Sequence, residues 1–148
     1  MEFALARHLP AFVVILALAL GLTGQAVSGA AEVMETPAPG QDGAGFTTLD
    51  SAELATMLQN KDFFFVNVHI PYEGEIDGTD ALIAFDKIAE NLDKLPSDKS
   101  AKIVLYCRSG RMSEIAALEL SRLGYTQVSH LSGGMIDWEA SGHEIVER

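Results

Sequence analysis

Four short apolar runs, separated by longer amphipathic stretches, organise the chain beyond residue 45. They are rich in β-branched and aromatic residues, which favour β-strands. The longest run, residues 63–69, is almost continuously apolar, which is typical of a strand buried on both faces of a parallel sheet. We therefore predict strands at residues 46–49, 63–69, 102–106 and 128–131.

Helical spacing of apolar positions fills most of the stretches between these strands. Residues 50–53 have the pattern of a capping box and predict the start of a helix. Residues 70–80 combine Pro, Gly and acidic side chains and predict a loop, whereas residues 81–95 predict one or two helices. The clearest amphipathic helix covers residues 113–123, and a short helix carrying Trp138 follows a Gly-Gly pair. Alternating strands and helices predict an α/β fold: a central, mainly parallel sheet flanked by helices on both faces.

The first 45 residues have a different character. Residues 1–30 predict a signal peptide: Arg7 and His8 precede an uncharged apolar run, and small residues follow before Ala31. The apolar run is shorter than the roughly 20 residues of a spanning helix, so cleavage is favoured over an uncleaved membrane anchor. Residues 31–45 predict a flexible Pro- and Gly-rich linker, which leaves one domain at residues 46–148. The expected location is extracytoplasmic, either periplasmic or secreted, with membrane contact only if the leader stays uncleaved.

Charge narrows the set of partners. The formal net charge is −11, which disfavours binding to nucleic acid or to an anionic membrane surface. Against this acidic background, Arg108 and Arg111 form a small basic cluster beside the only cysteine, Cys107. A single cysteine cannot form an intramolecular disulfide. We also expect the protein to be a monomer.

Cys107 lies where an apolar run ends and a polar, glycine-containing loop leads into a helix. Backbone N–H groups and the positive end of a helix dipole converge at such a position, which favours the thiolate and binds small anions. The alternative is a buried structural cysteine, but arginine and glycine are poor core neighbours. In parallel sheets, chemistry gathers at the carboxyl ends of strands, which is where Cys107 falls.

The histidines and the large aromatic residues are weaker candidates for a functional site. His69, His130 and His143 do not have metal-ligand spacing, so neither a metal nor another cofactor is expected. His69 follows a strand and could act as a base for Cys107, although a loop or supporting role is favoured. Trp138 and the phenylalanines at 63–65 are expected in the core.

Three stretches together resemble the rhodanese family of sulfurtransferases. They are the cysteine motif Val104–Ser113, the segment Leu123–Val128, and the Gly-Gly…Trp segment Leu131–Trp138. This resemblance implies a rhodanese-like fold and a sulfurtransferase of the thiosulfate:acceptor type. Cys107 would accept a sulfane sulfur as a persulfide from a small anionic donor. It would pass that sulfur to an external thiol, to cyanide or to a protein thiol.

The same resemblance implies a binding loop for the donor. Its members follow the catalytic Cys107 directly: Arg108, Ser109, Gly110, Arg111, Met112 and Ser113. The arginines would attract the anion, Gly110 would permit a tight turn, and Ser113 would cap the helix or donate to the persulfide.

Two alternatives stay open beside the sulfurtransferase. One is a non-catalytic persulfide carrier or interaction module of the same fold. The other, less favoured, is a cysteine phosphatase or arsenate reductase, which places an arginine six positions after its cysteine; here that position is Ser113.

The first loop departs from the family pattern. Rhodaneses commonly have Asp-Val-Arg before this loop and Gly-His-Ile-Pro-Gly-Ala within it, where this chain has Asn67-Val68-His69 and residues 74–79 (Gly-Glu-Ile-Asp-Gly-Thr). We expect Glu75 and Asp77 to bring negative charge towards the pocket mouth, which weakens attraction for a dianionic donor.

Overall fold

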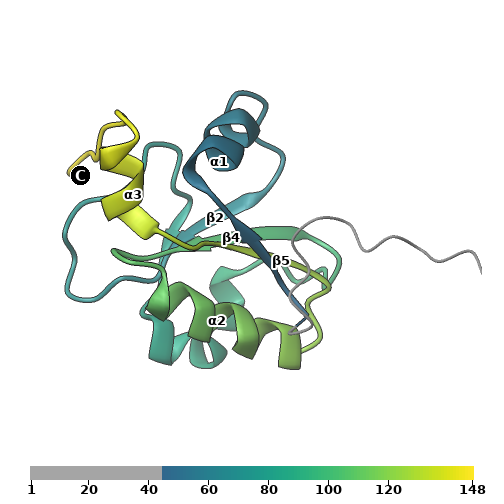
Figure 1. Ribbon diagram of the computed structural model, residues 1–148. Helices are drawn as coiled ribbons and strands as arrows, with labels where there is room; N and C mark the ends of the chain where they lie inside the picture. Colours follow the sequence, from purple (N-terminus) through teal and green to yellow (C-terminus); the bar gives the residue numbers. More distant parts are fainter. Residues whose placement is uncertain (1–44) are drawn as a thin grey trace, which may run out of the picture. The chain divides into compact units, whose positions relative to one another are not determined.

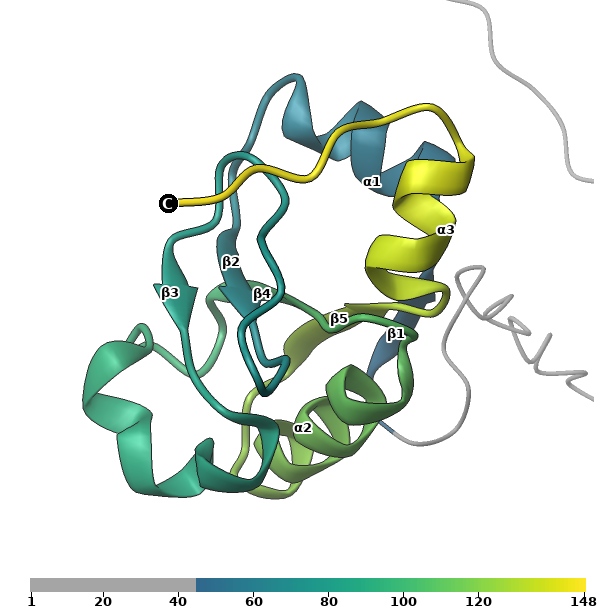
Figure 2. The same ribbon diagram turned by 90° about the vertical axis from the view of Figure 1, so that its left-hand side faces the viewer.

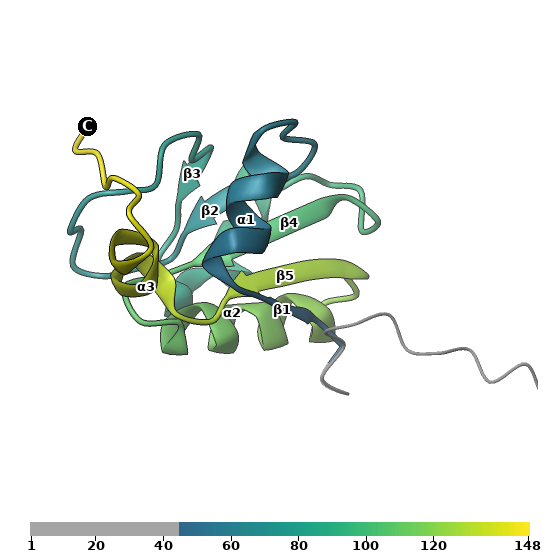
Figure 3. The same ribbon diagram turned by 45° about the horizontal axis from the view of Figure 1, so that its top comes forward.

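A computed structural model describes residues 45–148 of the chain. The predicted signal peptide and all but the last residue of the predicted linker lie outside the described residues. Five parallel strands form one sheet in the order β1-β5-β4-β2-β3, which can be followed by the labels in Figure 3. The strands are β1 (Thr47–Leu49), β2 (Phe64–Asn67), β3 (Ala81–Leu82), β4 (Lys102–Tyr106) and β5 (Gln127–Leu131).

Helices cover both faces of this sheet (Figures 1 and 3), as predicted. Helices α1 (Ser51–Leu58) and α3 (Gly134–Ala140) pack over one face. Helix α2 (Arg111–Arg122) packs over the other face, together with the short 3-10 segments η1 (Phe85–Lys87) and η2 (Ala89–Lys94). None of the helices formed by residues 45–148 is long and apolar enough to cross a bilayer.

The segment 81–95 differs from the predicted helices. It opens with strand β3, which pairs with β2, and the Ile83 amide extends the pairing by donating to the Asn67 carbonyl at 3.0 Å. The remainder winds as 3-10 turns, interrupted at Asn91, whose φ of −122° is not helical. Pairing with a distant strand therefore overrides the local helical spacing.

Helix α2 begins at Arg111, two residues before its predicted start, and ends in a Schellman motif. Gly124, which the sequence marks as a C-cap glycine, has φ +91° and donates its amide to the Ser121 carbonyl at 3.1 Å. The Tyr125 amide donates to the Leu120 carbonyl at 3.1 Å. These bonds fix the end of α2. The start of α2 is set by the loop that follows β4, where Gly110 is the N-cap.

The capping box predicted at the start of α1 is present. Asp50 accepts from the Glu53 amide at 2.8 Å, and Glu53 accepts from the Asp50 amide at 2.9 Å. The Ser51 hydroxyl then donates to Asp137 at 2.6 Å, which ties α1 to α3. The position of α3 is thus fixed from the side opposite to α2.

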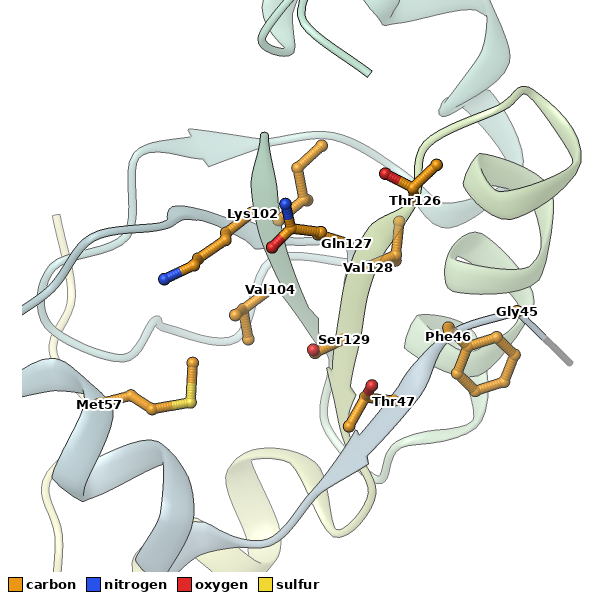
Figure 4. A pocket seen from close by; sticks show the side chains of 11 residues that line it. Gly45, Phe46, Thr47, Met57, Lys102, Val104, Thr126, Gln127, Val128 and Ser129 are labelled. Atoms are coloured by element: carbon orange, nitrogen blue, oxygen red, sulfur yellow. The ribbon is translucent and has the colours of Figure 1, made fainter. Parts of the chain in front are cut away.

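Two loops meet at the carboxyl edge of the sheet, because β2 and β4 are parallel neighbours. We call residues 68–80, after β2, the first loop, and residues 107–110, after β4, the cysteine loop. At the opposite, amino edge lies a hollow lined mainly by the first residues of β1, β4 and β5, with Met57 of α1 (Figure 4). Cys107 is not among the residues that line it, so the candidate chemistry lies at the other edge.

Candidate active site

Cys107 directly follows β4 and is almost wholly enclosed, with 1% of its surface exposed. Its thiol is free, and the Gly110 amide donates to Sγ at 3.1 Å. A hydrogen bond from the main chain to sulfur stabilises the thiolate, the nucleophilic form. The side chain is buried as the structural alternative requires, yet its sulfur has a polar partner that a packing role does not need.

Gly110 gives the cysteine loop its shape. Its φ of +92° is in the left-handed region, and a Cβ built there would lie 1.7 Å from the Ser132 carbonyl oxygen. Only glycine fits so close to another backbone segment in this conformation. The turn at Gly110 therefore both brings its own amide to the sulfur and starts α2.

The beginning of α3 fixes the other half of the cysteine loop. The Met135 amide donates to the Cys107 carbonyl at 2.9 Å, and the Ile136 amide donates to the Arg108 carbonyl at 3.0 Å. A Cβ on Gly134 would lie 2.4 Å from the Cys107 carbonyl oxygen, so this contact also requires glycine. The Gly-Gly…Trp segment identified in the sequence thus acts by letting α3 approach the cysteine loop.

Ser113 is buried behind the loop and does not cap α2, so that expectation is wrong. The N-cap is Gly110, and the Ser113 hydroxyl donates to the Gly110 carbonyl at 2.8 Å. Since the hydroxyl has one proton, its oxygen accepts from Nδ1 of His130 at 3.2 Å. Ser113 therefore supports the turn at Gly110 through the hydrogen bond to its carbonyl. A cysteine phosphatase has an arginine at the corresponding position, and this chain does not.

The two arginines have different surroundings. Arg108 donates from Nη1 to Glu73 Oε2 at 2.7 Å, across from the cysteine loop to the first loop. Arg111, at the first position of α2, is exposed and has neither an ion pair nor a side-chain hydrogen bond to the described residues. Of the other loop members, Ser109 is exposed, and Met112 packs partly against the core beneath α2.

Glu73 is the functional-site residue that sequence reasoning missed. Its Oε2 lies 2.9 Å from Nε2 of the buried His69 as well as 2.7 Å from Arg108. The hydrogen bond from His69 has the largest effect on the Glu73 carboxyl, and the one from Arg108 has the next largest. Together they hold the pKa of Glu73 below its usual value. The spacing of His69 and Glu73, four residues apart, was the available signal. His69 is thus a supporting residue, and its Nδ1 has no hydrogen-bond partner within residues 45–148.

Asn67 closes the base of the first loop. Its amide nitrogen donates to the Gly74 carbonyl at 3.0 Å, and its oxygen accepts from the His69 amide at 2.9 Å. An ionised aspartate, the residue common in rhodaneses at this point, could make only the second of these bonds. The departure from the family pattern therefore has a structural use in this chain.

Glu75 and Asp77 both pair with Arg148, whose single positive charge offsets only one of their two negative charges. The expectation that they weaken attraction for a dianionic donor stays a prediction. Arg148 lies 3.0 Å from Glu75 through Nε and 3.0 Å from Asp77 through Nη2. Residues 75 and 146 also form a short antiparallel bridge, and Figure 2 shows the last residues running beside the first loop. The unpredicted acidic contact to the cysteine loop comes from Glu73 instead.

The aromatic residues near the site are structural. The Tyr106 hydroxyl accepts from the Ile76 amide at 2.9 Å and lies 2.7 Å from the Thr79 hydroxyl, and burial raises the pKa of this phenol. Tyr72 is partly exposed and accepts from the Arg148 amide at 3.1 Å. Trp138 packs in the core, as predicted. Residues 45–148 contain no group of three or more His, Cys, Asp or Glu side chains arranged to hold a metal ion.

The fold and the site together define an α/β domain with a free, buried cysteine in a main-chain turn at the sheet's carboxyl edge. The Rhodanese-like domain family model matches residues 50–141, so the chain belongs to this family. The resemblance stated from the sequence is confirmed.

Solved structures of related domains agree with this assignment. A rhodanese-like domain protein from Staphylococcus aureus superimposes with a TM-score of 0.57 at 27% identity, covering 68% of this chain and 98% of its own. A rhodanese-related protein from Thermoplasma volcanium gives 0.57 at 24% identity, covering 67% and 96%; at that identity it shows the fold alone.

A curated relative has a more specific name. The tRNA uridine(34) hydroxylase of Erwinia tasmaniensis is 31% identical over 102 residues, which are 65% of this chain. The match spans only 29% of the length of that relative.

Proposed function

We propose that the protein is a sulfurtransferase in which Cys107 carries a sulfane sulfur as a persulfide. The observation that supports this most directly is the Gly110 amide, which donates to Sγ at 3.1 Å in a turn that only glycine can make. An amide on the sulfur stabilises both the attacking thiolate and the anionic persulfide that follows it.

The reaction divides into two displacements. The Cys107 thiolate attacks the outer sulfur of a thiosulfate-like donor; a new S–S bond forms, the donor's own S–S bond breaks, and its electron pair leaves with sulfite. An external thiolate or cyanide then attacks the outer sulfur of the persulfide, and the Cys107 thiolate departs with the electron pair of that bond. The sulfur atom moves without a change in overall electron count, so no separate oxidant or reductant enters.

The acceptor comes from outside the chain. Cys107 is the only cysteine, so the persulfide cannot resolve as an intramolecular disulfide. Arg111 is the group best able to attract an anionic donor, because its charge has no partner among the described residues.

Export forms part of the proposal and rests on residues 1–30 alone. A leader of that composition directs the chain to the periplasm or the outside, and an uncleaved leader would anchor it in the membrane. Intact mass of material recovered outside the cytoplasm tests this point. A mature chain beginning near Ala31 supports cleavage, and a full-length chain in the membrane fraction contradicts it.

Hydroxylation of tRNA, the activity in the name of the curated relative, is not proposed for this chain. The net charge of this chain, −11, opposes binding to the phosphate backbone of an RNA. The match also leaves all but 29% of that relative's length without a counterpart in the alignment.

Intact-mass spectrometry tests sulfur uptake directly. Incubation of the wild type with thiosulfate or polysulfide should add one sulfur atom, which cyanide then removes as thiocyanate. Cys107→Ser should take up none and form no thiocyanate. A wild-type mass that neither donor changes would refute sulfur transfer.

A persulfide carrier for a partner protein is the second candidate, and the pairing of Arg108 with Glu73 favours it by reducing the charge available to small anions. The carrier predicts a stable persulfide that turns over slowly with cyanide or small thiols. Rapid multiple turnover with small acceptors alone would exclude it.

A further inference from the structure

Glu73 is the one carboxylate that reaches the cysteine loop from the first loop within the described part of the chain. It contacts Arg108, the residue directly after Cys107, at 2.7 Å. We propose that Glu73 is a specificity-determining residue: by neutralising Arg108, it lowers the preference of the site for doubly charged sulfur donors. This inference rests on the proposed sulfur transfer.

The contact between Glu73 and Arg108 joins a negatively charged carboxylate to a positively charged guanidinium. His69 and Arg108 both donate to the same oxygen, Oε2, and they lower the pKa of the Glu73 carboxyl. The ring of His69 is buried and fixes Glu73 from the core side, with 8% of its side chain exposed. Glu73 is therefore a positioned negative charge beside the loop.

Arg111 gives the contrast that makes the effect measurable. Its side chain has no ion pair within residues 45–148, so one guanidinium beside the loop is compensated and the other is not. A single uncompensated charge suits a monoanion, whereas two uncompensated charges would favour a dianion. The donor class that fits this site best is a singly charged sulfane compound, such as a thiosulfonate.

Two sulfur donors that react by the same steps but differ in net charge can show how the site responds to the charge of the donor. Thiosulfate carries two negative charges and methanethiosulfonate carries one, and in both the Cys107 thiolate attacks the outer sulfur. The donor's S–S bond breaks in each case, and its electron pair leaves on sulfite or on methanesulfinate. The ratio of kcat/KM for thiosulfate over methanethiosulfonate therefore reports the charge at the site.

The test is this ratio in Glu73→Gln, with cyanide as acceptor. Glutamine keeps the size and polarity of the side chain but removes its charge, so the ratio should rise about 3- to 10-fold at low salt and less at high salt. Glu73→Asp keeps the charge and should leave the ratio near the wild-type value.

Glu119→Gln is the matched control. Glu119 also lies beside an arginine, Arg122, at 3.9 Å, but it is eight residues beyond Arg111 on α2, or about 12 Å along the helix. It changes the net charge equally and should not change the ratio.

The failures of the two proposals are distinguishable. If the wild type transfers sulfur from both donors and Glu73→Gln leaves the ratio unchanged, the role of Glu73 is overturned and sulfur transfer stands. If neither donor charges Cys107, sulfur transfer itself fails. Should Glu73→Gln not fold, Arg108→Gln asks the same question: it frees the charge of Glu73 and should lower the ratio, and an unchanged ratio overturns the inference.

Discussion

The two loops at the carboxyl edge of the sheet are stabilised in different ways. The cysteine loop is fixed by main-chain hydrogen bonds to the start of α3 and by a glycine in the left-handed region at Gly110. The first loop has a main-chain bridge between Glu75 and Val146, but it depends in addition on side chains: the amide of Asn67, the pair of His69 with Glu73, and the Tyr106 hydroxyl.

This difference separates two tasks. A loop held by main-chain contacts keeps its geometry when the side chains of Arg108 or Ser109 change, so its stabilisation of sulfur is insensitive to them. A loop that also depends on its side chains changes its charge and shape when they are substituted. We infer that the cysteine loop carries the chemistry and the first loop carries the selectivity.

The largest expected effect comes from adding one carbon to the cysteine loop. In Gly110→Ala the new Cβ would lie 1.7 Å from the Ser132 carbonyl oxygen, in addition to the strain of its positive φ. We expect a loss of about 3 kcal/mol or more in the free energy of unfolding. If the chain still folds, displacement of the amide from Sγ should slow sulfur uptake on the order of 100-fold. Urea unfolding and the rate of persulfide formation measure the two effects.

Gly124→Ala is the matched control for this prediction. Gly124 has nearly the same φ, +91°, but a Cβ there would meet nothing within 4 Å. The cost should be about 1 kcal/mol with unchanged sulfur uptake. Equal losses in the two variants would show that backbone strain alone, and not the close approach to Ser132, sets the requirement at Gly110.

An intermediate effect is expected in the first loop from Asn67→Asp, which restores the residue common in rhodaneses. A carboxylate cannot donate to the Gly74 carbonyl, and burial at this fully enclosed position penalises its charge. We expect a loss of about 1–3 kcal/mol in the free energy of unfolding. Asn91→Asp is the control, because Asn91 makes the same kind of bond, to the Lys87 carbonyl at 2.9 Å, in an exposed position. A wild-type stability for Asn67→Asp would contradict the account of this loop.

The smallest expected effect is the pH dependence of the Glu73 contacts. The pKa of Glu73 is lowered in the folded chain, so its stabilising contribution is fully present above the ordinary value of 4.5. It is lost as pH falls below 4.5 through the lowered value. The difference in melting temperature between the wild type and Glu73→Gln should therefore shrink from pH 6 towards pH 3, and a difference that grows on acidification would contradict the pairing.

The sequence was sufficient for the elements whose pattern is local. Strand β4 has the predicted bounds, and β1, β2 and β5 differ from theirs by three residues or fewer. The capping box and the Gly124 motif were also readable, because each lies within a few residues of its helix.

Features set by distant partners were not predictable in this way. Strand β3 exists because two residues pair with β2. Ser113 supports Gly110 because its hydroxyl donates to the Gly110 carbonyl and accepts from His130. The ion pairs of Glu75 and Asp77 depend on Arg148, more than 70 residues away in the chain. Each of these outcomes follows from tertiary contacts that no local pattern contains.

The hydrogen bonds from α3 have a consequence for the polarity of the cysteine loop. They take up the carbonyls of Cys107 and Arg108. In a trans peptide unit the N–H points away from the C=O, so the N–H groups of Arg108 and Ser109 point away from α3. Oxygen lone pairs that would repel an anion are thus turned to one side, and hydrogens are left on the other. Helix α3 thereby gives this stretch of backbone one side that presents N–H groups and another side whose carbonyls are already bonded.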